Sequence, residues 1–389
     1  MSTKTNFITW QPVLTDHQAF TYQALENLAD TRVISYVSSI EDKIRKKQGW
    51  LDSKLLLSSR ILIPHNNFFS YCFGAIRNNR NSIHIFAAPF MDWRFIPCML
   101  YAAHLNVKFY IISEPYSPRS EGYLNEVSQP LGALKVGLRP YLYRLYGLML
   151  AKSVAGVFAI SRLAYLQFKS AGFQDANIFL FGYFVPRKVS DKHSNTGEFT
   201  EDVKPIIKAI YIGSLIKRKG VDILFDVCEA LQNQGSKIVI DVYGPGNTDW
   251  LPINLPNFVY KGVIPFGEAQ EVMSRYDFAL VPSRHDGWGV AVNEAILAGI
   301  PVICSNKVGA SALIDRFGCG VKFKSRNVSE LLCVLKNLEN NPSLLKDMKQ
   351  RAINAGQFID PSVAANYMFS VFNSHPSKNT MIDSPWYRT

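Results

Sequence analysis

Short apolar runs alternate with amphipathic segments along the first half of the chain, and this alternation predicts a layered sheet with helices between its strands. Two segments, 17–29 and 93–105, have the spacing of amphipathic helices. The apolar runs that predict strands are 7–10, 32–38, 82–88, 107–113, 156–161 and 177–181. They lack polar alternation, which is typical of parallel strands that helices cover on both faces.

The same alternation resumes in the second half, after a charged and polar stretch bounded by prolines at 186–205. Predicted strands there are 207–215, 237–244, 258–264, 278–283 and 301–305. Predicted helices are 221–234, 267–276, 290–299, 328–341 and 342–356. Two separate blocks of alternating strands and helices predict an α/β protein with two Rossmann-like, doubly wound domains.

The polar stretch sets the expected domain boundaries. We expect an N-terminal Rossmann-like domain at 1–190, a linker at 191–205 and a C-terminal Rossmann-like domain at 206–364. The remaining residues, 365–389, are expected to form a tail that crosses back to the N-terminal domain.

Composition excludes several classes of protein. The chain has 389 residues, of which 48% are hydrophobic and 19% charged, so it is globular rather than disordered. No signal peptide opens it and no apolar run is long enough to span a membrane, since Lys152 interrupts 145–160. Six cysteines without a C-x-x-C pair predict reduced core residues. We therefore expect a cytoplasmic protein, either soluble or peripheral at the cytoplasmic face of a membrane.

The formal net charge of +11 favours anionic partners. No zinc-finger, basic-zipper or RNA-recognition pattern occurs, so nucleic acid is not expected as a partner. A basic run at 43–47 reads as a solvated helix face. The segment 134–152, rich in Leu, Tyr and Arg, fits either an anionic membrane surface or a helix packed across the first domain.

The first candidate site is "YIGSLIKRKG" at 211–220. A strand ends near Ile212, and Gly213 then permits close approach of the backbone to a ligand. Lys219 would place a positive charge beside a phosphate at the following helix N-terminus. The alternative is an ordinary turn with exposed lysines.

The second candidate site is "SRHDGWGVAVNEAILAGIPVI" at 283–303. Gly287, Trp288 and Gly289 form the predicted turn at a helix N-terminus, whose free amides suit an anion or sugar hydroxyls. Asp286 precedes the turn and Glu294 follows it, so the two carboxylates can hold different parts of one ligand. The alternative is a helix N-terminus stabilised by acidic residues. Both sites together fit a ligand with a diphosphate and polyols, such as a nucleotide sugar.

These two motifs resemble the signature of glycosyltransferase family 4, with Asp286 and Glu294 in the two acidic positions of its E-x7-E motif. The strong part of the resemblance covers about 211–314, and 159–173 and 181–186 match more weakly. The resemblance implies the GT-B architecture, in which two Rossmann-like domains face a central cleft. It also implies a retaining enzyme that uses a nucleotide-diphosphate sugar.

The resemblance implies a role for each matching residue. Lys219 would neutralise the donor diphosphate, and Glu294 would hold the ribose hydroxyls. Asp286 and the amides of Gly287, Trp288 and Gly289 would contact the transferred sugar and the β-phosphate. The remaining donor-binding residues would be Gly213, Ser214, Arg218, Gly262 and Val263. Gly262 and Val263 would border the base of the donor nucleotide. The loop 244–246 would form another part of the cleft.

The chain departs from the family pattern in three places. Ser214 stands where an Arg is common, so Arg218 or Lys217 would supply that phosphate contact. Glu114 falls where many members have a His near the sugar, and we predict it as the catalytic group of the first domain, with Lys219 and Asp286. Asp16 and His17 replace a glycine-rich first loop and are candidates for the acceptor side. No D-x-D occurs, so neither a metal nor another cofactor is expected.

We predict a hexosyltransferase that acts on a glycan acceptor, lipid-linked in our first interpretation, in the biosynthesis of a surface polysaccharide such as lipopolysaccharide, O-antigen or capsule. One alternative is a soluble transferase that makes a small glycoside. The other is a protein that binds nucleotide sugars without catalysis, which the departures at Ser214 and Glu114 leave open.

Overall fold

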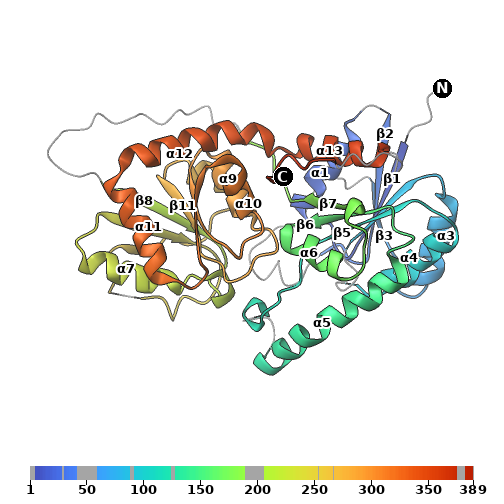
Figure 1. Cartoon of the computed structure of the whole chain (residues 1–389), viewed down its shortest axis with the longest axis horizontal. Coiled ribbons are helices and arrows are strands. Elements are labelled where there is room, and N and C mark those ends of the chain that lie inside the picture. The colour runs from blue at the N-terminus through green and yellow to red at the C-terminus, as the bar shows by residue number, and fades with distance from the viewer. Residues whose placement is uncertain are drawn as a thin grey trace.

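Two parallel β-sheets, one in each half of the chain, carry the architecture in the computed structural model (Figure 1). The structure describes residues 5–28, 30–41, 59–87, 92–123, 128–188, 206–252, 254–265, 267–374 and 382–388. The expected linker at 191–205 and the basic run at 43–47 lie outside these residues.

The first sheet has the described strand order β3-β2-β1-β4-β5-β6-β7, with every neighbouring pair parallel. Its strands are β1 Thr5–Gln11, β2 Thr31–Val37, β3 Arg60–Leu62, β4 Ile83–Ala87, β5 Phe109–Ser113, β6 Gly156–Ile160 and β7 Ile178–Phe181. Its helices are α1 Asp16–Glu26, α3 Phe68–Asn78, α4 Phe95–His104, α5 Gln129–Leu150 and α6 Arg162–Ser170, with 3₁₀ turns η2 Ser120–Tyr123 and η3 Asp175–Asn177. All five residues of β5 and of β6 are buried, as expected of a parallel sheet covered on both faces.

The second sheet has the order β10-β9-β8-β11-β12-β13 and is also parallel. Its strands are β8 Ile207–Ile212, β9 Ile238–Tyr243, β10 Phe258–Tyr260, β11 Phe278–Val281, β12 Val302–Ser305 and β13 Gly320–Phe323. The described α-helices in this half of the chain are α7 Ile223–Asn233, α8 Ala269–Met273, α9 Val290–Leu297, α10 Ser311–Phe317, α11 Val328–Asn340, α12 Pro342–Ala355 and α13 Pro361–Asn373. Two 3₁₀ turns are η4 Lys217–Lys219 and η5 Gly356–Phe358.

The predicted α/β class with two Rossmann-like domains is confirmed. Element boundaries differ in the second half: the strand expected at 258–264 ends at Tyr260, and the helix expected at 267–276 spans only 269–273. Gly262 has φ of +88° and starts a loop, although the apolar sequence "GVI" is typical of a strand.

The end of the chain lies on the first domain. Helix α13 packs against α1, and the rings of Phe372 and Phe7 lie 5.0 Å apart. Lys108 Nζ donates to the carbonyl of Phe372 at 2.7 Å. Figure 1 shows this helix beside α1, while α12 runs over the second domain.

A buried aromatic cluster joins the two domains. Phe184, in the segment after β7, lies 4.2 Å from the ring of Trp386 and 5.9 Å from that of Trp288. Tyr387 donates its hydroxyl to the carbonyl of Phe181 at 2.9 Å. The loops at the carboxyl ends of both sheets therefore meet across a packed junction.

Candidate functional site

Loops at the carboxyl ends of β8, β9 and β10 stack closely in the second domain. The amide of Gly213 donates to the carbonyl of Tyr243 at 3.0 Å, and that of Gly244 donates to Gly262 at 2.9 Å. Strand register thus brings Gly213, Ser214 and Gly262 into neighbouring loops, as expected for parallel strands. Val263 follows on the surface with 53% of its area exposed.

The η4 loop reaches the loop that follows β11 through a glycine. Gly220 has φ of +76°, and a Cβ there would lie 2.2 Å from the carbonyl oxygen of Pro282. Only glycine fits that conformation and that approach without strain. Arg218 then lies against the next loop, since its carbonyl accepts from the amide of Arg284 at 2.8 Å and its Nη1 donates to the carbonyl of His285 at 3.3 Å.

Lys219 and Asp286 form a short ion pair. The distance between Lys219 Nζ and Asp286 Oδ2 is 2.6 Å, and both side chains are largely buried. Burial acts to raise the pKa of Asp286, but the positive charges of Lys219 and Arg218 outweigh it and lower that pKa. Asp286 is therefore ionised at neutral pH.

The turn at 287–289 is fixed by main-chain bonds to the loop after β12. The amide of Asp286 donates to the carbonyl of Lys307 at 3.0 Å, and the amide of Ala310 donates to that of Trp288 at 2.8 Å. Gly289 has φ of +95° and ends the turn directly before α9. The first amides of a helix have no partner within it, so this turn and α9 present donors suited to an anion.

Glu294 lies one turn into α9 and is partly buried. Burial raises its pKa to about 7, although the positive charge of Lys188 acts in the opposite direction. A carboxyl group with this pKa is poised to gain or lose a proton when a polar ligand contacts it.

The indole of Trp288 is buried in the junction between the domains. Only 1% of this residue is exposed, and its Nε1 donates to Asn293 Oδ1 at 2.8 Å. A Cβ on Gly182 would lie 2.4 Å from the indole ring, so the ring fills the space beside the segment that follows β7. Trp288 can offer a ligand its main chain but not its indole.

The first domain contributes Glu114, which follows β5 and is exposed. A Cβ on Gly287 would lie 2.3 Å from Glu114 Oε2, so this carboxylate sits directly against the turn of the second domain. The structure thus brings Glu114, Gly287 and Asp286 to one place from opposite domains.

Asp16 and His17 begin α1, where the sequence prediction put a loop of the acceptor side. His17 is 7% exposed, and its ring lies 4.8 Å from that of Tyr183. Its position is that of a packing residue at the domain junction. The acceptor role of both residues stays a prediction.

Sequence reasoning missed two residues beside the predicted ones. The ring of His285 lies against Gly122 of the first domain, since a Cβ added to Gly122 would be 3.2 Å from His285 Cδ2. Burial lowers the pKa of His285 to about 4, so its ring is neutral at pH 7. Lys188 lies near Glu294, and its Nζ would be 2.6 Å from a Cβ on Gly267. The only sequence signal for Lys188 is the basic "PRK" at 186–188, which opens the charged and polar stretch before the second domain.

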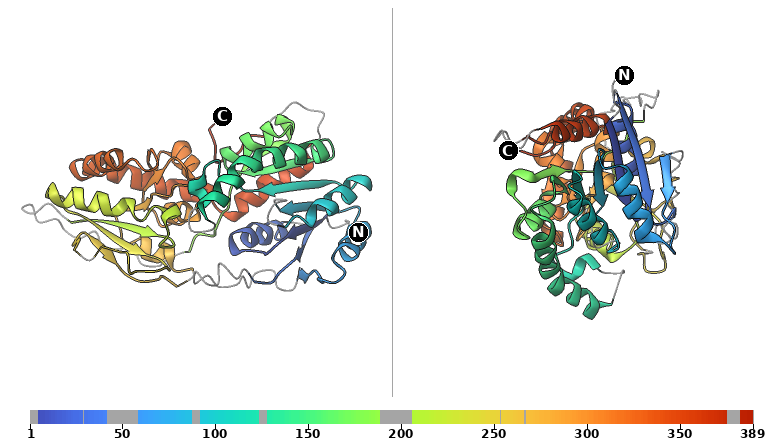
Figure 2. Two further views of the ribbon diagram at one scale, coloured as in Figure 1. Left: turned by 90° about the horizontal axis from the view of Figure 1, so that it is seen from below. Right: turned by 90° about the vertical axis from the view of Figure 1, so that its right-hand side faces the viewer.

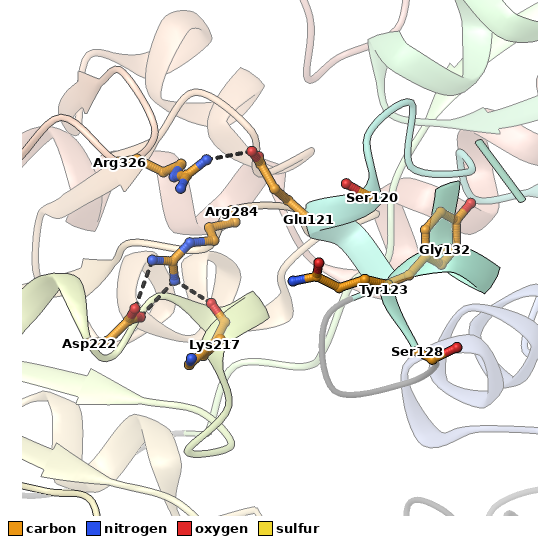
Figure 3. Close-up of a pocket in the computed structure, with 10 residues that line it drawn as sticks. Ser120, Glu121, Tyr123, Ser128, Gly132, Lys217, Asp222, Arg284 and Arg326 are labelled. Carbon is orange, nitrogen blue, oxygen red and sulfur yellow. Dashed lines mark hydrogen bonds and ion pairs between the residues drawn. The ribbon is translucent and has the colours of Figure 1, made fainter. Parts of the chain in front are cut away.

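A pocket of about 410 Å³ lies between the domains beside η4 (Figure 3). Its second-domain wall includes Lys217, Asp222 and Arg284. The guanidinium of Arg284 donates two hydrogen bonds, of 2.6 and 2.7 Å, to the carboxylate of Asp222. An ion pair between Arg326 and Glu121, at 2.5 Å, joins the second domain to η2. Polar and charged side chains from both domains therefore line this pocket.

Residues 198–355 match the family model described as glycosyl transferases group 1. The O-antigen biosynthesis glycosyltransferase WclY of Escherichia coli is 34% identical over 166 residues, which cover 41% of this chain and 45% of WclY. The chain thus spans less than half the length of this relative. The family-model match at 198–355 covers the loops that hold Gly213, Lys219, Asp286 and Glu294.

Solved structures extend the likeness to the whole fold. HepE of Anabaena, solved with UDP, has a TM-score of 0.68 at 12% identity, with 95% of this chain and 100% of HepE covered. The lipopolysaccharide outer core galactosyltransferase WaaB, in its apo form, has a TM-score of 0.63 at 13% identity, covering 94% and 99%. The chain therefore has the GT-B fold, and its second domain matches the group 1 glycosyl transferases.

Proposed function

We propose that the protein is a retaining glycosyltransferase of family 4 that moves a hexose from a nucleotide-diphosphate sugar to a glycan acceptor in surface polysaccharide biosynthesis. The observation that carries this proposal is the Lys219–Asp286 pair at the turn before α9, with Glu294 one turn further on. This set offers a cation, free amides and two carboxylates, which complement a diphosphate flanked by polyols.

The donor would lie along the carboxyl edge of the second sheet. Its base would border Gly262 and Val263, and its ribose hydroxyls would donate to Glu294. The diphosphate would replace Asp286 as the ion-pair partner of Lys219. It would also contact Arg218, with Gly213 and Ser214 beneath it. UDP is the first nucleotide to test, because HepE was solved with UDP.

Transfer requires the bond between the anomeric carbon and the β-phosphate oxygen to break as the acceptor oxygen bonds to that carbon. Negative charge then grows on the departing phosphate, where Lys219 and the amides at 287–289 would stabilise it. In a retaining reaction the departing phosphate oxygen takes the acceptor proton on the same face of the sugar. Asp286 and Glu114 would hold the sugar from the two domains.

The acceptor side is proposed to be the pocket between η2 and η4, together with Asp16 and His17. Support for the pocket comes from its walls, which belong to both domains and include Arg284, the second residue before Asp286. WclY and WaaB are named for O-antigen and lipopolysaccharide biosynthesis, which favours a glycan acceptor, lipid-linked in our interpretation.

Calorimetric titration with UDP, GDP and ADP, followed by assays of transfer and hydrolysis with the matching sugars, tests the proposal. We expect one nucleotide to bind at micromolar concentration and its sugar to be turned over. Tight binding without transfer or hydrolysis of any donor would favour the non-catalytic alternative. No binding of any nucleotide would overturn the proposal.

A further inference from the structure

Helix α5 presents a continuous apolar stripe to solvent. Leucines and a tyrosine recur along it with alternating spacings of three and four residues, and each is between 49% and 84% exposed. They are Leu131, Leu134, Leu138, Tyr141, Leu145 and Leu148. Side chains three and four apart share one face of a helix, so these six form a single stripe, called here the α5 stripe. The helix has 22 residues and is therefore about 33 Å long.

The opposite face of α5 is fixed against the first domain. Gly147 is packed so closely that a Cβ there would lie 1.8 Å from the carbonyl oxygen of Ala171. The ring of Tyr143 lies 5.4 Å from that of Phe168, and Tyr146 donates its hydroxyl to the sulfur of Met99 at 3.1 Å. The helix cannot turn about its axis to bury the stripe without losing these contacts. Figure 1 shows α5 along the lower edge of the first domain, and it stays at the periphery in the right-hand view of Figure 2.

The charge around the stripe has one sign. No Asp or Glu occurs anywhere from residue 127 to 174. Lys135, Arg139 and Arg144 lie on α5 itself, and Lys152 follows its end. The whole chain carries a formal net charge of +11. An exposed apolar stripe with cations beside it is the pattern of helices that lie in the headgroup region of an anionic bilayer.

We propose that the α5 stripe binds the surface of a membrane that contains anionic phospholipid, with α5 lying in the plane of the interface. A second copy of the chain fits this surface less well, because pairing two α5 helices would place Lys135, Arg139 and Arg144 against like charges. The helix lies on the membrane rather than across it: Pro140 and three cations interrupt it, and no helix among the described residues is long and apolar enough to span a bilayer.

This placement bears on the pocket between the domains. Gln129 and Gly132, in the first turn of α5, also line that pocket. The ring of Tyr123 in η2 lies 5.5 Å from Lys135 Nζ, which ties the pocket wall to the helix. A membrane on the α5 stripe would therefore lie near the pocket. The stripe is separate from the donor-binding loops, so membrane binding can be tested without any substrate.

Sedimentation with vesicles tests the proposal on the full chain. Two sets of vesicles are needed, one of phosphatidylcholine alone and one of phosphatidylcholine and phosphatidylglycerol in equal amounts. The unaltered protein should sediment with the anionic vesicles, less at high salt, and far less with the neutral ones. Leu138→Glu with Leu145→Glu should lower the partition coefficient by roughly ten- to a hundredfold, because each leucine then no longer enters the apolar layer.

Two further variants separate the apolar and the charged contributions. Replacing Lys135, Arg139 and Arg144 by Gln should weaken binding to anionic vesicles by about fivefold per charge and remove most of the salt dependence. Leu166→Glu on α6 is the matched control, because Leu166 is 52% exposed, similar to Leu138 at 49%, but lies outside the stripe. It should bind vesicles like the unaltered chain.

Circular dichroism and thermal melting must show that each variant is folded, and the double leucine variant should melt like the control. Sedimentation velocity without vesicles tests the alternative that a second copy of the chain covers the stripe. The proposal is overturned if the unaltered chain does not bind anionic vesicles. It is equally overturned if the stripe and control variants bind alike, or if the chain is a dimer that the leucine substitutions dissociate without any vesicle binding.

Discussion

Lys219 Nζ lies 2.6 Å from Asp286 Oδ2, in a pair that joins the loop after β8 to the loop after β11. A diphosphate at this turn has to compete with Asp286 for the ammonium group. Donor binding would therefore exchange one anion for another at Lys219 and leave the Asp286 carboxylate available to a sugar hydroxyl. The two residues should consequently respond differently to substitution.

Lys219→Ala should impair both donor binding and turnover. Nucleotide affinity should fall about tenfold or more because a charged hydrogen bond is lost. Turnover should fall further, on the order of 10²-fold, because the departing phosphate gains charge. Titration calorimetry and initial rates at saturating donor measure the two effects. A variant that loses affinity but keeps full turnover would contradict a role in stabilising the departing phosphate.

Asp286→Asn should not lower the affinity for the free nucleotide, because the proposed partner of Asp286 is the sugar and the loss of its charge removes a competitor for Lys219. Turnover should fall on the order of 10²-fold if that contact strengthens in the transition state. The same calorimetry and rate assay apply. Equal losses of nucleotide affinity in this variant and in Glu294→Gln, with turnover intact, would show that the two carboxylates do not divide the donor between them.

Nucleotide affinity should depend on pH through Glu294, whose pKa burial raises from 4.5 to about 7. If the ionised carboxylate accepts from ribose, affinity should fall as the pH drops below about 7 and binding should release protons there. Glu294→Gln should lower affinity by roughly ten- to a hundredfold at higher pH and flatten the profile. Calorimetry in buffers of different ionisation enthalpy counts the protons. Proton uptake instead of release would refute this assignment.

The fold was largely predictable because buried parallel strands such as β5 and β6 leave long apolar runs in the sequence. The loops at 213–220 and 286–294 could also be located, since their glycines and charges follow strands directly. Sequence pattern could not show that the indole of Trp288 points into the domain junction. That orientation depends on Gly182, more than a hundred residues away in the chain.

Other parts of the site arise only from tertiary contact. His285 and Gly122 meet across the domain boundary, and so do Glu114 and Gly287. No local pattern encodes such a meeting. Likewise, the segment 134–152 allowed either a packed helix or a membrane-facing one. Helix α5 has one packed face and one exposed apolar face, which periodicity alone could not resolve because both faces are apolar.

Activity should survive removal of divalent metal. The sequence has no D-x-D for a metal-bound diphosphate, and Lys219 with the amides before α9 would supply the positive potential instead. Rates measured after EDTA treatment, with and without added Mg²⁺ or Mn²⁺, test this expectation. A loss of activity that either metal restores would count against it.

Gly182→Ala should destabilise the junction between the domains. The added methyl would lie 2.4 Å from the Trp288 ring, which is 1% exposed and held by a hydrogen bond to Asn293. Overpacking of this kind costs about 1–3 kcal/mol, so the variant should melt at a lower temperature. Because Trp288 also carries the turn beside Asp286, its displacement should lower donor affinity as well. Gly74→Ala is the matched control: Gly74 lies inside α3, no atom beyond its chain neighbours and the backbone of its own helix is within 4 Å of the added methyl, and Ala is the better helix former. That control should melt at the same or a higher temperature. If both variants melt alike and bind nucleotide equally, the close fit between Gly182 and Trp288 does not support the donor site.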